Sequence, residues 1–132
     1  MDGAVCPGCE SRLLGAVPYM KIWFHEMKKS FPDIHVAWAF RGEKDQNAEF
    51  ISGKSKLRWP FSRHNRLDKD GNQAAEALDI FQQVNGKGLW DPGTNYRINK
   101  KSKELGFGVK WGGEFKTLGD SGHFEVLAED PM

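Results

Sequence analysis

The spacing of apolar residues predicts a helix followed by a buried strand in the first third of the chain. Over residues 18–30, Tyr19, Trp23 and Met27 recur at helical spacing, and the proline that opens this segment suits a first helical turn. Residues 34–40 are crowded with β-branched and aromatic side chains, which predicts a strand with little solvent exposure.

The middle of the chain carries weaker patterns. A short helix is expected over residues 43–52, ended by Gly53, and a loop is expected over residues 55–61. The acidic segment 68–72 has the composition of a turn between two extended segments. The apolar run at 74–84 fits either a helix or a buried strand, and periodicity alone does not decide between them.

The last third predicts one helix and two short strands. We expect a loop over 86–93, a basic helix over 94–105 with Thr94 as its N-cap, and strands at 107–111 and 124–126. Separate helices and strands of this kind predict an α+β domain, with a small antiparallel sheet and flanking helices. Residues 1–17 are rich in glycine and small side chains and are expected to form an extended arm, which leaves 18–132 as the folded domain.

Length and charge narrow the function classes. The chain has 132 residues, which suits a single domain, and 19 basic against 18 acidic residues give a net charge of +1. This balance provides no electrostatic basis for nucleic-acid or membrane partners. No apolar run approaches the roughly 20 residues of a membrane span. The sequence shows no signal-peptide pattern, so we expect the protein to be made in the cytoplasm. We also expect it to be a monomer.

The two cysteines, Cys6 and Cys9, form a Cys-x-x-Cys pair. Such a pair is half of a zinc-ribbon site, but no second pair follows. Reduced thiols in an N-terminal turn, a reversible disulfide and an adventitious metal site remain open. A zinc-ribbon nucleic-acid binder is disfavoured by the missing pair and by the charge balance.

Candidate chemistry gathers around two histidines and two aspartates. His64, Asp79 and His123 can make a three-ligand zinc site that leaves one position for water, as in hydrolytic zinc enzymes. Asp120 is then left as the base that takes a proton from that water. Asp79 interrupts an apolar run, where a carboxylate is costly unless it is paired or bound to metal. A loop histidine and a core histidine are the plain alternatives for the two imidazoles.

Three further residues are candidates for binding substrate. Arg41 directly follows the expected strand, where its guanidinium suits bidentate capture of a carboxylate, although a surface salt bridge is the simpler alternative. Gln46 lies one turn into the next helix and is a candidate for the same cleft. Trp111, which precedes two glycines, would line a groove or cap the core.

Taken together, these residues resemble a known family. The motifs Ser62-x-His64, Ala77-x-Asp79, Trp111-Gly-Gly-x-Phe115 and Asp120-x-x-His123-Phe-Glu125 are similar to those of the D-alanyl-D-alanine carboxypeptidase-like zinc peptidases, which share a fold with the amino-terminal domain of Sonic hedgehog. The resemblance runs from about residue 18 to 126 and is strongest for the phage endolysin branch, the L-alanyl-D-glutamate endopeptidases.

The resemblance implies roles for individual residues. It implies Zn²⁺ held by His64, Asp79 and His123, with Asp120 as general base and then acid. Arg41 would anchor a peptide carboxylate, and Ser62 would lie at the cleft wall. The implied substrate is a peptide bond of the bacterial peptidoglycan stem, which the enzyme would reach from the cytoplasm of an infected or lysogenic cell after release.

One spacing departs from the family pattern. Fourteen residues separate His64 from Asp79, which predicts a lengthened hairpin that carries both ligands on adjacent strands. The acidic turn at 68–72 has some likeness to a calcium loop, but its glycine is at the wrong position for an EF-hand.

Two alternative functions share this fold. A D-Ala-D-Ala carboxypeptidase would use the same motifs, and a hedgehog-like binding module would keep a metal without turnover. A binding module has no need of the base Asp120 or the anchor Arg41, so the sequence favours a peptidase.

Overall fold

The protein is built on one antiparallel sheet in the order β1-β2-β5-β4. The computed structural model describes residues 7–114 and 121–126. The strands of this path are β1 (Ile34–Trp38), β2 (Ala77–Val84), β5 (His123–Val126) and β4 (Val109–Trp111). A short strand, β3 (Lys87–Leu89), pairs with the far end of β2. The α+β architecture with an antiparallel sheet is therefore confirmed.

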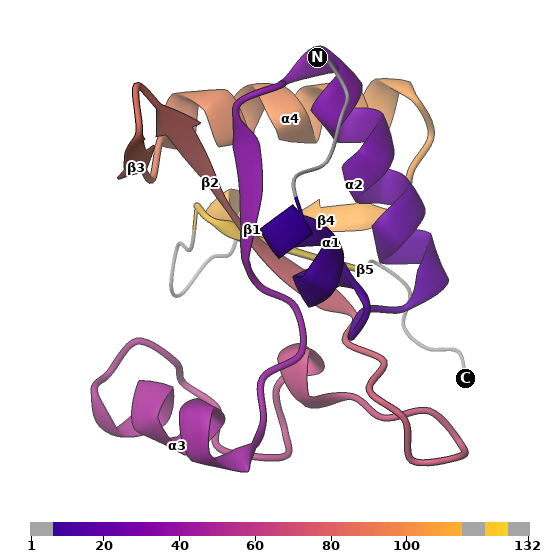
Figure 1. The fold of residues 1–132 in the computed structure, drawn as a ribbon, viewed down its shortest axis with the longest axis vertical. Coiled ribbons are helices and arrows are strands. Elements are labelled where there is room, and N and C mark those ends of the chain that lie inside the picture. Colours follow the sequence, from indigo (N-terminus) through magenta and orange to yellow (C-terminus); the bar gives the residue numbers. More distant parts are fainter. Residues whose placement is uncertain (1–6, 115–120, 127–132) are drawn as a thin grey trace.

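Within the described residues, four α-helices accompany the sheet (Figure 1): α1 (Pro7–Leu13), α2 (Pro18–Ser30), α3 (Glu43–Ile51) and α4 (Pro92–Glu104). Helices α2 and α4 contact each other through Trp23, whose Nε1 donates a hydrogen bond to Ser102 Oγ at 2.9 Å. The same indole packs on Phe124 of β5, with ring centroids 4.9 Å apart. Figure 1 shows α3 away from the other helices, beyond the end of β1.

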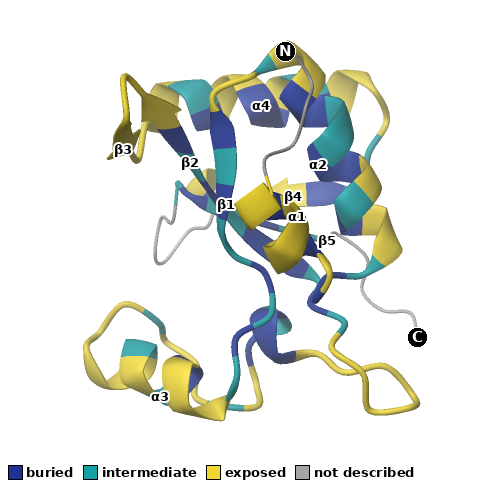
Figure 2. Ribbon diagram, in the orientation of Figure 1, coloured by how far each residue is buried: buried dark blue, intermediate teal, exposed yellow. Residues whose placement is uncertain are grey.

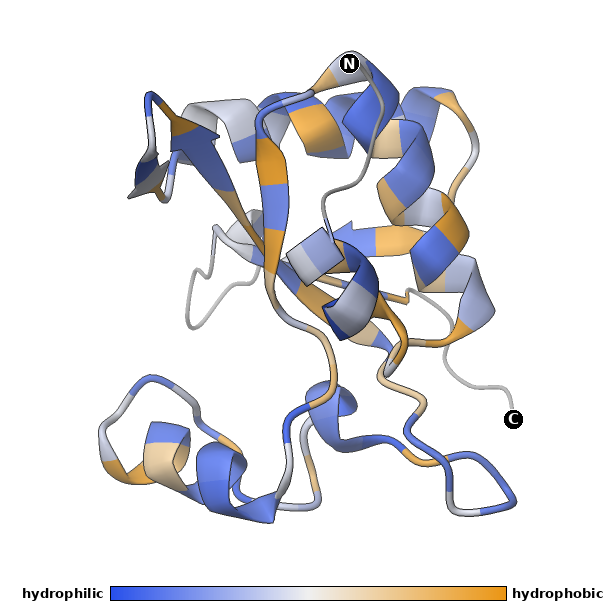
Figure 3. Cartoon of the chain, in the orientation of Figure 1, coloured by the Kyte–Doolittle hydropathy of each residue, from blue (hydrophilic) through white to orange (hydrophobic). Residues whose placement is uncertain are grey.

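The core lies between α2, α4 and one face of the sheet. Leu78 and Ile80 alternate along β2 with Asp79 and are fully buried, as is Phe124 on β5. Figure 2 shows the buried residues along β1, β2 and the inner sides of α2 and α4, and Figure 3 shows apolar positions on the same segments. Because side chains alternate between faces, Asp79 points to the opposite face, which these two helices do not cover.

The prediction of an extended N-terminal arm is wrong for the part of it that the structure describes. Residues Pro7–Leu13 form α1, and its side chains Cys9 and Leu13 are buried in the core. The Sγ atom of Cys9 accepts a hydrogen bond from the backbone N–H of Val36 at 3.3 Å. Helix α1 therefore covers the edge of β1, which would otherwise present unpaired amides. Cys6 lies outside the described residues.

Three other local predictions change. The expected loop at 86–93 contains β3 and the start of α4, and Asp91, rather than Thr94, is the N-cap of that helix. Asp91 Oδ1 accepts from Gly93 N at 3.0 Å, and the proline that follows it suits the first turn. The ambiguous run 74–84 is strand β2 over most of its length, since it pairs on both sides.

The buried face of α2 also differs slightly from its prediction. Trp23 and Met27 are fully buried, together with Met20 and Phe24, whereas Tyr19 is 39% exposed at the rim. Within the described ranges 7–114 and 121–126, no helix is both long and apolar enough to cross a bilayer.

Adjacent leucines at the end of α1 test whether this helix belongs to the core. Leu13 is 2% exposed and Leu14 is 75% exposed. We predict that Leu13→Ala lowers the free energy of unfolding by about 2–5 kcal/mol, because it leaves a cavity. The control Leu14→Ala should change it by less than about 0.5 kcal/mol. Urea denaturation of both variants measures the difference, and equal effects would contradict the packing of α1.

Candidate metal centre

The sheet brings Asp79 and His123 together. Asp79 on β2 pairs directly with His123 on β5 in the antiparallel register. Side chains at directly opposed positions project from the same face and lie about 4.5–5.5 Å apart at Cβ. The residues on either side of Asp79 point into the core, so both polar side chains emerge on the face away from α2 and α4.

His64 arrives from a different element, the 3₁₀ helix η1 (Arg63–Asn65). Ser62 caps this turn by accepting from His64 N at 3.1 Å, while Asn65 Oδ1 accepts from Ser62 N at 3.0 Å. The turn is tied to the segment leaving β1, because Arg41 N donates to His64 O at 2.9 Å. His64 is thereby held at 2% exposure above the open face of the sheet.

The three predicted ligands converge. Asp79 Oδ1 lies 3.3 Å from His64 Nε2 and 3.2 Å from His123 Nδ1. One potential ligand atom from each residue lies within 4.8 Å of the other two. Residues far apart in sequence, with Asp79 and His123 alone separated by 44 positions, therefore form a group positioned to hold a metal ion.

Each ligand is oriented by a second partner. His64 Nδ1 lies 2.7 Å from the carbonyl oxygen of Ala39, which can only accept, so this nitrogen carries a proton and Nε2 is the ring nitrogen that faces Asp79. His123 Nε2 faces the carboxylate of Glu125 at 2.8 Å. Two imidazoles and a carboxylate are ligands typical of zinc sites, and a hydrogen bond at the second ring nitrogen is the usual support of a histidine ligand. These residues therefore fit a zinc ion.

Without a metal, the group is a tightly coupled set of charges. Burial acts to raise the pKa of Asp79, but the imidazoles of His64 and His123 outweigh it, and the pKa lies well below its usual range. Burial acts to lower the pKa of His123, but hydrogen bonds to Asp79 and Glu125 raise it to about 10. The carboxylates of Asp79 and Glu125 therefore favour a positive charge at this position.

Arg41 lies beside the ligands but is committed to protein partners. Its Nη2 donates to Asp79 Oδ2 at 3.0 Å and its Nη1 to Gln46 Oε1 at 3.1 Å, and its guanidinium lies over the Trp38 ring at 4.7 Å. Each Nη carries a second N–H besides the one used in these bonds. Arg41 also lines the cleft. Its role as a carboxylate anchor stays a prediction.

Gln46 occupies a different place from the one expected. It is fully buried and is not among the residues that line the cleft. Its Nε2 donates to Ser55 Oγ at 3.0 Å and to Leu57 O at 2.6 Å, and its Oε1 accepts from Asn65 as well as from Arg41. Gln46 therefore positions Arg41, η1 and the loop after α3 relative to one another.

The remaining predicted site residues have different outcomes. Ser62 is at the cleft wall, although its hydroxyl is engaged by His64 N. Trp111 does not line the cleft; it is 8% exposed and donates from Nε1 to Ser121 O at 2.9 Å. Asp120, the predicted base, lies outside the described residues.

A cleft of about 720 Å³ opens over the ligands. His64, Asp79 and His123 all line it, as do side chains from the loop after α3. Sequence reasoning missed Arg63, whose Nε lies 3.2 Å from Glu125 Oε2 and which thereby holds the partner of His123. Its position next to His64 was the available signal.

The prediction that a lengthened hairpin carries both ligands on adjacent strands is wrong in one respect. Asp79 lies on a strand as expected, but His64 lies on η1 and not on the neighbouring strand. The inserted residues form a narrow loop closed by the bridge between Leu67 and Gln73. Asp68 Oδ1 accepts from Asp70 N and Asn72 N within this loop, which is the bonding of an ordinary Asx turn.

Comparison with solved structures is informative about the fold. No protein-family model and no curated protein matches the sequence. The fold is similar to that in the crystal structure of the L-Ala D-Glu endopeptidase ChiX from Serratia marcescens, with a TM-score of 0.69 and 24% identity. The match covers 89% of this chain and 85% of that chain. At this identity, the comparison shows a shared fold.

The charge coupling predicts how the metal-free protein responds to pH. The pKa of His123 is raised from 6.5 to about 10, so its contribution to stability is fully present below pH 6.5 and is lost as pH rises through about 10. We predict that chelator-treated wild type melts at a higher temperature than His123→Gln at pH 6, and that this advantage shrinks steadily toward pH 10. Calorimetry across this range measures it, and an unchanging difference would contradict the coupling.

Proposed function

We propose that this chain is a zinc-dependent peptidoglycan peptidase that hydrolyses a peptide bond of the cell-wall stem, with L-Ala–D-Glu as the preferred linkage. The observation that carries the proposal is the convergence of His64, Asp79 and His123 at the floor of a cleft. The fold shared with an L-Ala D-Glu endopeptidase supports the same reaction class. The sequence motifs around these residues, and their likeness to endolysin peptidases, support it independently.

The proposed chemistry divides between the ion and the chain. When bound, zinc supplies a Lewis acid that polarises the scissile carbonyl and makes water nucleophilic near neutral pH. His64, Asp79 and His123 hold the ion, and Glu125 and the Ala39 carbonyl keep the two imidazoles in orientation.

Asp120 is proposed to move the proton. It stands three residues before His123 in sequence, immediately ahead of the described segment that leads into β5. Its carboxylate would accept a proton from the attacking water and deliver it to the leaving amine. Arg41 would bind a carboxylate of the peptide through its free N–H groups, and so orient the bond to be cut.

The biological setting follows from the same proposal. A peptidase of this kind would serve a phage or prophage in lysis, acting on the wall after release from the bacterial cytoplasm, as a monomer. The support for this setting is the resemblance of the motifs to the endolysin branch.

Metal analysis tests the ligand assignment. We predict that purified wild type binds about one zinc ion per chain and that His64→Ala and His123→Ala lose it, because two remaining ligands hold zinc weakly. His25→Ala is the matched control, since His25 is on α2 and outside the cleft. Mass spectrometry of metal content decides the matter, and zinc retained by both ligand variants would overturn the site.

Hydrolysis of defined muropeptides tests the base. Asp120→Ala should keep its zinc but lose at least about a hundredfold in kcat, the usual contribution of a general base. Asp70→Ala, a change in an exposed turn, should behave as wild type. Parent-rate digestion by Asp120→Ala would show that another group takes the proton. Zinc-loaded wild type that leaves every muropeptide intact would favour the binding-module alternative.

A further inference from the structure

Two lysines of the cleft wall have no acidic partner in the part of the chain that the structure describes. Lys54 and Lys56 lie in the connection between α3 and η1, and both line the cleft. Among residues 7–114 and 121–126, neither side chain takes part in a hydrogen bond or ion pair. The arginines of the same cleft differ, because Arg41 pairs with Asp79, Arg63 with Glu76 and Glu125, and Arg66 with Glu76.

The backbone that carries these lysines is fixed on both sides. Lys54 N donates to Glu49 O at 2.9 Å, which ties the loop to the end of α3. Beyond Lys56, the carbonyl of Leu57 accepts from the buried Gln46 at 2.6 Å, and Leu57 N donates to Ser55 Oγ at 3.1 Å. The backbone of this loop is therefore fixed beside the cleft, while the two lysine side chains that line it stay exposed.

The surrounding charges leave these two ammonium groups uncompensated. Asp79 and Glu125, the acids at the cleft floor, are each engaged by an arginine. Glu49 also lines the cleft, but no ion pair joins it to either lysine. In a chain with a net charge of +1, this is a local concentration of positive charge, which favours an anionic ligand.

We propose that Lys54 and Lys56 form a subsite for a second carboxylate of the substrate, so that the cleft selects acidic peptides with a free, unamidated carboxyl near the scissile bond. This inference rests on the proposed function and specifies its substrate class. The first carboxylate would be held by Arg41 in a directed, bidentate manner. Lysines act instead as hydrated point charges, which attract a carboxylate without strict geometry and depend strongly on salt.

Equilibrium binding of two matched peptides tests the subsite. Both carry a ketomethylene group in place of the scissile amide and a free C-terminal carboxylate; they differ only in a carboxylate or carboxamide on the residue after that bond. We expect the full chain to bind the carboxylate form roughly three- to tenfold more tightly in about 0.05 M salt, since exposed ion pairs contribute modestly. The preference should shrink in about 0.5 M salt.

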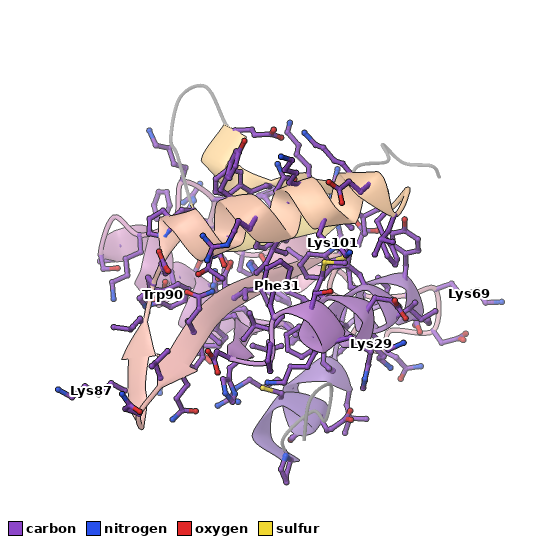
Figure 4. The ribbon with its side chains drawn as sticks, turned by 90° about the horizontal axis from the view of Figure 1, so that it is seen from above. Lys29, Phe31, Lys69, Lys87, Trp90 and Lys101 are labelled. Atoms are coloured by element: carbon purple, nitrogen blue, oxygen red, sulfur yellow. The ribbon has the colours of Figure 1, made fainter. Side chains whose placement is uncertain are left out.

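A charge-matched pair of double variants isolates the lysines. Lys54→Gln/Lys56→Gln should lose most of the carboxylate preference, whereas Lys69→Gln/Lys87→Gln should keep it. Lys69 and Lys87 project away from the body of the protein in Figure 4, and neither lines the cleft. The control removes the same two charges, so it corrects for a change in net charge.

The outcomes separate this inference from the proposed function. An unchanged preference in the Lys54→Gln/Lys56→Gln variant, or wild type that binds both peptides equally or not at all, overturns the subsite. Binding does not require turnover, so a protein that prefers the carboxylate peptide but cleaves no muropeptide would retain the subsite and refute the peptidase. Cleavage of carboxylate and carboxamide muropeptides with equal kcat/KM would refute only the subsite.

Discussion

The structure depends on one buried carboxylate. Asp79 stands near the start of β2, an inner strand of the sheet, where an ionised group is stable only if opposite charges and donors surround it. Three elements supply them: the segment after β1 brings Arg41, η1 brings His64, and β5 brings His123. The requirement to compensate this charge therefore gathers distant parts of the chain at one point on the open face of the sheet, with ligand atoms facing inward.

A layer of polar contacts behind the ligands turns this gathering into a defined geometry. Gln46 bonds Arg41, Asn65 and the loop after α3, so the ligand turn and the cleft wall share one buried anchor. Glu125, itself held by Arg63, keeps the His123 ring in place. Such supports restrict the rotamers of ligands, which is what metal affinity and substrate orientation require. The positions of the proposed metal and of the proposed carboxylate subsite are therefore physically coupled.

The pattern of apolar and polar residues predicts those features that interactions between sequence neighbours determine. Helix α2 followed from its apolar spacing, and Asp79 was identifiable because a carboxylate interrupts an apolar run. Helix α1 was missed because its stability comes from burying Cys9 and Leu13 against β1, a tertiary effect without local periodicity. The run at 74–84 stayed ambiguous because only strand partners on both sides decide it. The convergence of the ligands matched the expectation from motifs, whereas the elements that carry them, η1 above all, required the fold.

Zinc K-edge X-ray absorption of the purified protein tests the central claim most directly. If His64, Asp79 and His123 hold the ion, the first shell contains imidazole nitrogen and carboxylate oxygen at about 2.0–2.2 Å, and no sulfur. The competing site would use the thiolates of the Cys-x-x-Cys pair at Cys6 and Cys9, with a zinc–sulfur distance of about 2.3 Å. Sulfur in the first shell, or a spectrum that does not change in the His123→Ala variant, would contradict this account.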